Sequence, residues 1–182
     1  MDPIPDFPSL QHAEKLRHDP EQKERMSAPR MSQVIVAKAF APLPAGADKR
    51  TIITFLVQSL VNAKKLDASK VSEIVDGAMA REAIGSTGIG HGIAIPHCRT
   101  PVVPQIVCAF GSSTEGIDFD SLDGEPVYSV FLLLTPPEQK EQHLLLMKSF
   151  AGQIRKENFC KFLHQVKTFQ DLVDLLAEFE GR

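Results

Sequence analysis

The sequence predicts a single α/β domain, in which we expect a mixed β-sheet with helices packed on both faces. Stretches with the apolar spacing of helices alternate along the chain with short apolar runs of strand length, and turn residues separate them. The 182 residues suffice for one domain plus a tail, and a hydrophobic share of 43% is enough to bury a core.

Residues 1–30 differ from the rest of the chain. They hold many charged residues, and four of the 13 prolines lie before Ser27. Such a segment buries too little apolar surface to offset the entropy lost on ordering it. We therefore predict a flexible extension over residues 1–30, with a short helix around residues 11–18, and a globular domain over residues 31–182.

The first elements of the domain follow in order. Val34 and Val36 alternate in a β-rich run, which predicts the first strand. Asp48 offers a helix cap just before an apolar pattern that begins at Ile52. The next helix has the spacing of a half-buried helix and should end near Gly85. Its apolar stripe consists of Val71, Ile74, Val75, Ala78 and Met79.

Strands and helices continue to alternate in the second half. A pair of prolines and Glu138 open a helix that runs through Leu144 and Leu145 to Ile154. Thr168 and Asp171 have the spacing of a capping box, which predicts the start of the final helix. Short apolar runs bounded by Pro or Gly predict the strands. These strands are expected at residues 92–95, 106–110 and 127–134.

Composition excludes several classes of protein. A net charge of −3 argues against a nucleic-acid-binding surface, which must be basic. No apolar run approaches the roughly 20 residues that span a bilayer, and the acidic, proline-containing start is unlike a signal peptide. The three cysteines are widely spaced, so reduced thiols are expected rather than disulfides or a thiolate zinc site. We predict a cytoplasmic protein without membrane insertion.

A glycine-rich segment carries the first chemical signal. Four glycines fall between Gly85 and Gly92, where they allow close backbone approach and positive φ angles. Ser86 and Thr87 add hydroxyl donors, and converging donors of this kind suit an anion such as phosphate. The spacing is neither a dinucleotide fingerprint nor a P-loop. Taken alone, the glycine pattern fits two interpretations equally well: a loop that binds an anion, and a loop whose shape serves packing only.

His97 gives this segment a candidate nucleophile. It follows a short apolar strand and Pro96, whose ring fixes φ, so its side chain can project from a sheet edge. An imidazole with a pKa of about 6.5 is mostly neutral in the cytoplasm and needs no base before it attacks phosphorus. A hydrogen bond to one ring nitrogen would leave the other free. An isolated histidine, however, more often has a surface or packing role.

The run from Arg81 to His97 resembles the active-site signature of a known family. It is similar to the fructose/mannitol-type (type 2) enzyme IIA domain of the bacterial phosphoenolpyruvate-dependent phosphotransferase system, and most of all to its nitrogen-regulatory branch. Residues 117–127 resemble the loop before a later strand of that family, and residues 132–145 resemble the segment with its second active-site histidine. The resemblance covers about residues 33–180 of this chain.

The resemblance implies a site and a set of partners. His97 would accept a phosphoryl group from an HPr-like phosphocarrier, and Arg81 and His143 would support that group. Ser86 or Thr87 could complete the phosphate cradle, and no metal or cofactor is required. These residue types suit phosphoryl transfer, because the protein must position three charged oxygens and stabilise their charge.

Each supporting residue also has a plain structural interpretation. Arg81 lies at a helix end, where a cation interacts favourably with the helix dipole. His143 on its own is typical of a surface histidine. His91 departs from the residue type expected there, and we favour a solvent-facing position; Cys98 fits by size and has no assigned chemistry. His91, His97 and His143 could form a zinc site, but no cysteine or carboxylate lies at ligand spacing.

Two function classes share the same phosphohistidine. In one, the chain relays phosphate to an enzyme IIB domain for fructose- or mannitol-type sugar uptake. In the other, which we favour, it is a regulatory module whose phosphorylation state selects its target proteins. A phosphoryl group brings a charge of about −2 to a surface, which is enough to make or break an interface.

Overall fold

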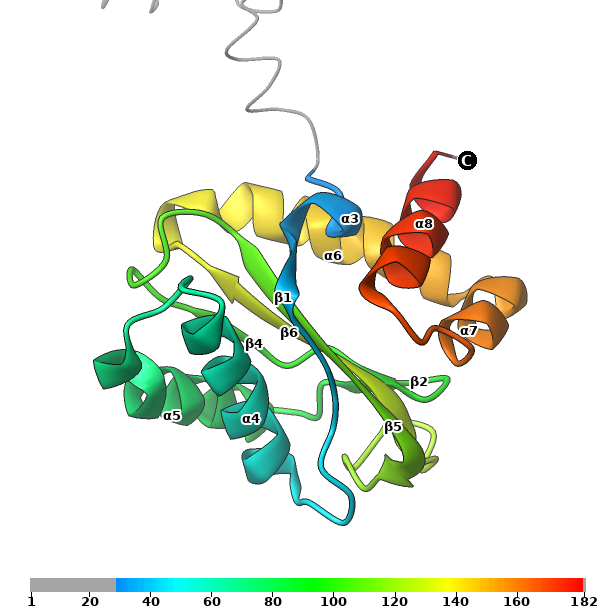
Figure 1. Ribbon diagram of the computed structural model, residues 1–182, viewed down its shortest axis with the longest axis horizontal. Coiled ribbons are helices and arrows are strands. Elements are labelled where there is room, and N and C mark those ends of the chain that lie inside the picture. The colour runs from blue at the N-terminus through cyan, green and yellow to red at the C-terminus, as the bar shows by residue number, and fades with distance from the viewer. Residues whose placement is uncertain (1–28, 182) are drawn as a thin grey trace, which may run out of the picture.

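The computed structural model describes residues 29–181, and its centre is a six-stranded mixed sheet (Figure 1). The strand order is β1-β5-β6-β3-β2, and β4 also pairs with β6. β5 and β6 are antiparallel, whereas β1 runs parallel to β5, and β3 and β4 run parallel to β6. The strands are β1 Ile35–Pro42, β2 Gly88–Gly90, β3 Ile93–Ala94, β4 His97–Arg99, β5 Val107–Ile117 and β6 Val127–Thr135.

Helices cover both faces of this sheet, as predicted (Figure 1). The side chains of β6 alternate between two cores: Val130 and Leu132 pack towards α4 and α5, whereas Phe131 and Leu133 pack towards α6, α7 and α8. The helices are α3 Met31–Val34, α4 Lys49–Asn62, α5 Val71–Glu82, α6 Lys140–Ile154, α7 Glu157–Leu163 and α8 Phe169–Glu180, with 3-10 turns at Ala68–Lys70 and Pro137–Gln139.

The two predicted helix caps are confirmed. The side chain of Asp48 accepts a hydrogen bond from the backbone N–H of Thr51 at the start of α4. Thr168 and Asp171 form a reciprocal capping box at the start of α8. Both caps satisfy backbone donors that the first turn of a helix leaves without partners, which is why these side chains mark the helix starts.

Some predicted elements were wrong in extent. Val34 closes the short helix α3, and the first strand begins only at Ile35. β5 runs seven residues beyond the predicted end at Phe110, because its polar second half still pairs with β6. The sequence did not indicate β2, β4 or α7, which have few residues and little periodicity. The predicted helix through Leu144 and Leu145 to Ile154 is present as α6; these two leucines are exposed, and its buried face contains His143, Leu146, Phe150 and Ile154.

Residues 1–28 of the predicted extension, with the short helix predicted around residues 11–18, lie outside the described residues. Between residues 29 and 181, none of the helices combines the length and the hydropathy needed to cross a bilayer.

Candidate functional site

The site forms where α5 packs closely against β4. A Cβ atom at Gly77 would lie 2.7 Å from the Sγ of Cys98, so the missing side chain lets the helix approach the strand. Arg81 follows Gly77 by four residues and therefore lies on the same helix face. His97 is the neighbour of Cys98, and this packing brings the guanidinium of Arg81 to its ring.

The imidazole of His97 is held from two sides. Its Nδ1 lies 2.9 Å from the carbonyl oxygen of Ile95, and its Nε2 lies 3.0 Å from the Nε of Arg81. A carbonyl oxygen can only accept a hydrogen bond, and a guanidinium can only donate one. The neutral ring therefore carries its proton on Nδ1 and a lone pair on Nε2. Nε2 is the atom that can attack phosphorus.

Burial keeps this imidazole neutral. Loss of solvent lowers the pKa of His97 below the usual value, the hydrogen bond to Ile95 opposes this shift, and the positive charge of Arg81 adds to it. Since an ordinary imidazole is already mostly neutral at pH 7, the lowered pKa makes the nucleophilic form dominant in neutral solution.

His143 lies beside His97 and is not a surface residue. The centroids of the two rings are 5.2 Å apart, and His143 is only 8% exposed. Its Nδ1 lies 2.9 Å from the Oγ1 of Thr135, a buried residue of β6. Burial lowers the pKa of His143 to about 4, with smaller contributions from the neighbouring His97, Arg99 and Arg81. The expectation of a surface histidine, drawn from the sequence alone, was wrong.

The buried His143 should make the protein less stable in acid. Its pKa is about 4 when folded and near 6.5 when unfolded, so the unfolded chain binds more protons between these values. The contribution of the neutral His143 to the free energy of unfolding is therefore fully present above pH 6.5, and it is lost as the pH falls towards 4. We expect wild type to lose about 2 kcal/mol more than His143→Gln between pH 7 and 4.5, measured by urea unfolding. Equal losses in the two proteins would contradict the burial of a neutral imidazole.

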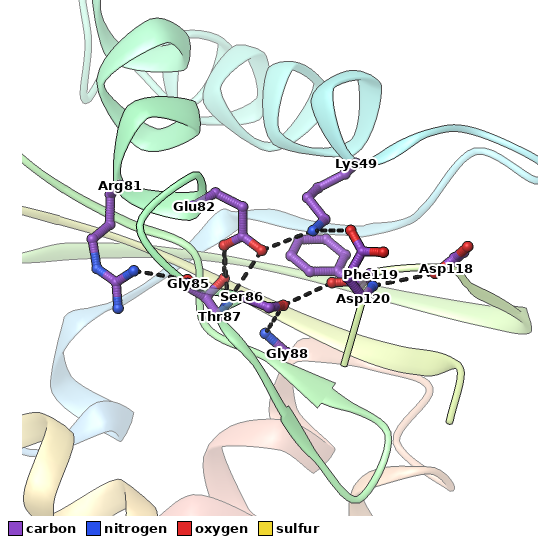
Figure 2. Close-up of polar contacts among 10 residues, drawn as sticks. All are labelled: Lys49, Arg81, Glu82, Gly85, Ser86, Thr87, Gly88, Asp118, Phe119 and Asp120. Carbon is purple, nitrogen blue, oxygen red and sulfur yellow. Dashed lines mark hydrogen bonds and ion pairs between the residues drawn. The ribbon is translucent and has the colours of Figure 1, made fainter. Parts of the chain in front are cut away.

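Ser86 and Thr87 lie close to this site but bond within the protein (Figure 2). The Oγ of Ser86 donates to the carbonyl of Phe119 at 2.8 Å and accepts from the N–H of Gly88 at 3.0 Å. Thr87 is 3% exposed, and its Oγ1 donates to the carboxylate of Glu82 at 2.5 Å. Each hydroxyl proton already has a partner, so direct binding of phosphate by either residue remains a proposal.

His91 lies away from His97. It adopts a left-handed conformation with φ +56° at the turn between β2 and β3, and it is exposed. The carbonyl oxygen of the neighbouring Gly92 accepts hydrogen bonds from the backbone N–H groups of Tyr128 and Ser129 in β6. His97 pairs instead with Leu133, which lies about 13 Å from Ser129 along β6 at roughly 3.3 Å per residue. The three histidines considered for zinc therefore do not share one site.

Three residues near the site were missed in the sequence. Arg99 contributes positive charge beside both histidines, Thr135 holds His143, and Glu82 binds the glycine-rich segment. For Arg99 and Glu82, the sequence does contain a signal that could have indicated them. Arg99 follows His97 by two residues, the spacing that puts side chains on one side of a strand. Glu82 is an acid in the last turn of a helix, where the helix dipole disfavours it unless it has a tertiary partner.

Comparison with known proteins gives consistent matches. A family model described as "Phosphoenolpyruvate-dependent sugar phosphotransferase system, EIIA 2" matches residues 37–179, which include Arg81, His97 and His143. The Nitrogen regulatory protein of Pseudomonas aeruginosa is 32% identical over 153 residues, 84% of this chain and 97% of that protein. A fructose-specific EIIA component from Haloferax volcanii is 34% identical over 132 residues, 72% of this chain and 84% of that protein.

A solved structure matches the fold as well. The crystal structure of the Nitrogen Regulatory Protein IIA-Ntr from Neisseria meningitidis has a TM-score of 0.71 and 28% sequence identity to this chain. The match covers 80% of this chain and 98% of that one.

Proposed function

Because this chain belongs to the EIIA 2 family of the phosphoenolpyruvate-dependent sugar phosphotransferase system, we propose that it carries a phosphoryl group on Nε2 of His97. The observation that carries the proposal is the arrangement of this ring, with Nδ1 held by Ile95 and the lone pair of Nε2 beside Arg81. Members of this family are phosphotransfer components. The family resemblance implies a phosphohistidine, and the geometry of His97 supports this residue as its site.

The proposed transfer needs no proton movement at His97. The lone pair of Nε2 attacks phosphorus, the bond between phosphorus and the donor atom breaks, and its electron pair leaves with the donor. Nδ1 keeps its proton and its hydrogen bond to Ile95. The guanidinium of Arg81, freed from Nε2, can turn to the phosphoryl oxygens, where charge-assisted hydrogen bonds stabilise the developing charge. His143 would donate from the second side of the site, and Ser86 or Thr87 would assist if their present bonds are exchanged.

We favour a regulatory phosphocarrier. The supporting observation is the similarity to nitrogen regulatory proteins, which extends over 97% of the Pseudomonas aeruginosa relative. In this function, an HPr-like phosphocarrier is the donor, and the phosphorylated and unphosphorylated forms contact different target proteins. The charge added at Nε2 alters a surface that already holds Arg81 and Arg99, which provides a physical basis for the switch.

The second candidate is sugar uptake. The similarity to the fructose-specific EIIA component of Haloferax volcanii supports it. Here the phosphoryl group would continue from His97 to an enzyme IIB domain. Incubation of the phosphorylated chain with purified enzyme IIB domains distinguishes the two functions. Only a component of sugar uptake should transfer its phosphoryl group rapidly to one of these domains.

We also propose that the chain works in the cytoplasm. Its three cysteines, Cys98, Cys108 and Cys160, are all free thiols in the fold. Free thiols suit a reducing compartment.

Intact-mass analysis tests the phosphocarrier proposal. The protein is incubated with phosphoenolpyruvate, enzyme I and an HPr-like donor, and we expect the mass of a single phosphoryl group to be added. The label should be lost in acid and survive in base, because a phosphorus–nitrogen bond to imidazole hydrolyses when protonated. An acid-stable label, or no label with any donor of this class, would count against a phosphohistidine.

A further inference from the structure

Glu82 is a buried carboxylate next to the phosphate-supporting Arg81. Its side chain is only 4% exposed and accepts from three donors (Figure 2). The Nζ of Lys49 lies 2.9 Å away, the backbone N of Thr87 lies 2.9 Å away, and the Oγ1 of Thr87 lies 2.5 Å away. Burial raises the pKa of Glu82, but the hydrogen bonds from Thr87 and Lys49, together with the charge of Lys49, outweigh it and lower this pKa, so the group is an anion at neutral pH.

Lys49 supplies the charge that balances this carboxylate. It lies at the first turn of α4 and is 16% exposed. Its Nζ also contacts the carboxylate of Asp120 at 2.9 Å and lies 5.0 Å from the centre of the Phe119 ring (Figure 2). A buried anion is tolerated when it is paired and hydrogen-bonded, and these contacts meet both conditions. The pair therefore joins α4, α5 and the two loops beside the site.

The hydrogen-bond chain continues from Glu82 to His97. Thr87 is fixed by Glu82, and its carbonyl oxygen accepts from the backbone N of Ile95 at 2.9 Å. The carbonyl oxygen of Ile95 then accepts from Nδ1 of His97, also at 2.9 Å. Two consecutive residues thus act on opposite sides of the imidazole. Arg81 contacts Nε2 directly, and Glu82 reaches Nδ1 through Thr87 and Ile95.

We propose that Lys49 and Glu82 are a positioning pair which, through Thr87 and Ile95, fixes the ring orientation and the Nδ1–H tautomer of His97. The pair touches no phosphoryl oxygen. It keeps the Ile95 carbonyl aimed at Nδ1, and so keeps the lone pair of Nε2 directed at the incoming phosphorus. This inference rests on the proposed function of His97, and it gives Thr87 a positioning role.

The test uses Glu82→Gln and two measurements. An amide has one acceptor oxygen where the carboxylate has two, so Lys49 and the two donors of Thr87 can no longer all be satisfied. Nitrogen-15 NMR at pH 8 reports the tautomer of His97 in the unphosphorylated protein. We expect Nδ1–H almost alone in wild type and a mixture of tautomers in the variant. Phosphoryl transfer from the HPr-like donor should slow about 10- to 100-fold, as for a small misplacement of a reacting group.

The neighbouring ion pair provides a matched control. Arg50 of α4 pairs with Asp76 of α5, so it joins the same two helices from the residue beside Lys49, but both partners are exposed. Arg50→Met should keep the wild-type tautomer and a transfer rate within about twofold of wild type, because exposed ion pairs contribute little. If Arg50→Met slows transfer as much as Glu82→Gln, the effect comes from helix packing and the proposal is overturned.

Other outcomes also decide the question. Wild-type tautomer and rate in Glu82→Gln would overturn the positioning pair. If Glu82→Gln does not fold, Thr87→Val is used, because it removes one donor to Glu82 with little change of volume. The same shift of the His97 tautomer is expected in milder form. An unchanged tautomer in Thr87→Val overturns the proposal. If wild type takes up no phosphoryl group, the proposed function fails, whereas the tautomer of the unphosphorylated variants still tests the positioning pair separately.

Discussion

We expect His97→Ala to abolish phosphorylation of this chain by an HPr-like donor, a loss of at least about 10³-fold in rate. The reason is that, among residues 29–181, no second nucleophile has the same setting. Nε2 of His97 carries a lone pair beside a guanidinium, whereas the neighbouring His143 is buried, with its Nδ1 bonded to Thr135. Phosphoryl incorporation, followed by intact mass, measures the effect. The fold should survive, because His97 is half-buried at the end of the sheet and not part of either core.

A second histidine serves as the control for this variant. His91 belongs to the same glycine-rich segment but is exposed, and it has a left-handed backbone that asparagine tolerates well. His91→Asn should therefore accept a phosphoryl group at the wild-type rate. Normal phosphorylation of His97→Ala, or loss of phosphorylation in His91→Asn alone, would show that His97 is not the phosphoacceptor.

Arg81→Ala should slow transfer by about 10³-fold while the protein stays folded. The guanidinium contacts Nε2 at 3.0 Å, and in the proposed transfer it moves to the phosphoryl oxygens, so its loss removes a stabilising charge from the transition state. Arg81→Lys should recover only part of the rate, since an ammonium lacks the planar fork that binds two oxygens at once. Rapid-quench measurement of the first turnover reports the chemical step directly.

The folded state of the Arg81 variants separates two interpretations. Arg81 also donates from Nη1 to the carbonyl of Gly85 at 2.9 Å, a contact that helps to end α5. If this contact were its main role, Arg81→Ala would lose helical circular dichroism and unfold at a clearly lower temperature. A folded but slow variant supports the role in transfer, and a folded variant with the wild-type rate contradicts it.

The sequence by itself determined the fold class, the main helices and the chemistry to look for. Period-3.6 stripes and side-chain caps such as Asp48 and Thr168 are local signals, because the residues that produce them are close in the chain. The resemblance carried by Arg81, the glycine-rich segment and His97 identified the family, which the comparisons confirm. Short elements such as β4 and α7 were missed, since they have too few residues to show a period.

Only the tertiary structure decided how these residues act. His143 is distant from His97 in sequence, and its burial against Thr135 depends on the packing of α6 over β6. The hydroxyl of Thr87 is turned to Glu82, which no local pattern indicates, and Glu82 is paired with Lys49 from another helix. The physical reason is that hydrogen bonds and burial depend on which groups meet in space. A sequence pattern specifies which groups are available, and the packing of α4 and α5 on the sheet specifies which of them meet.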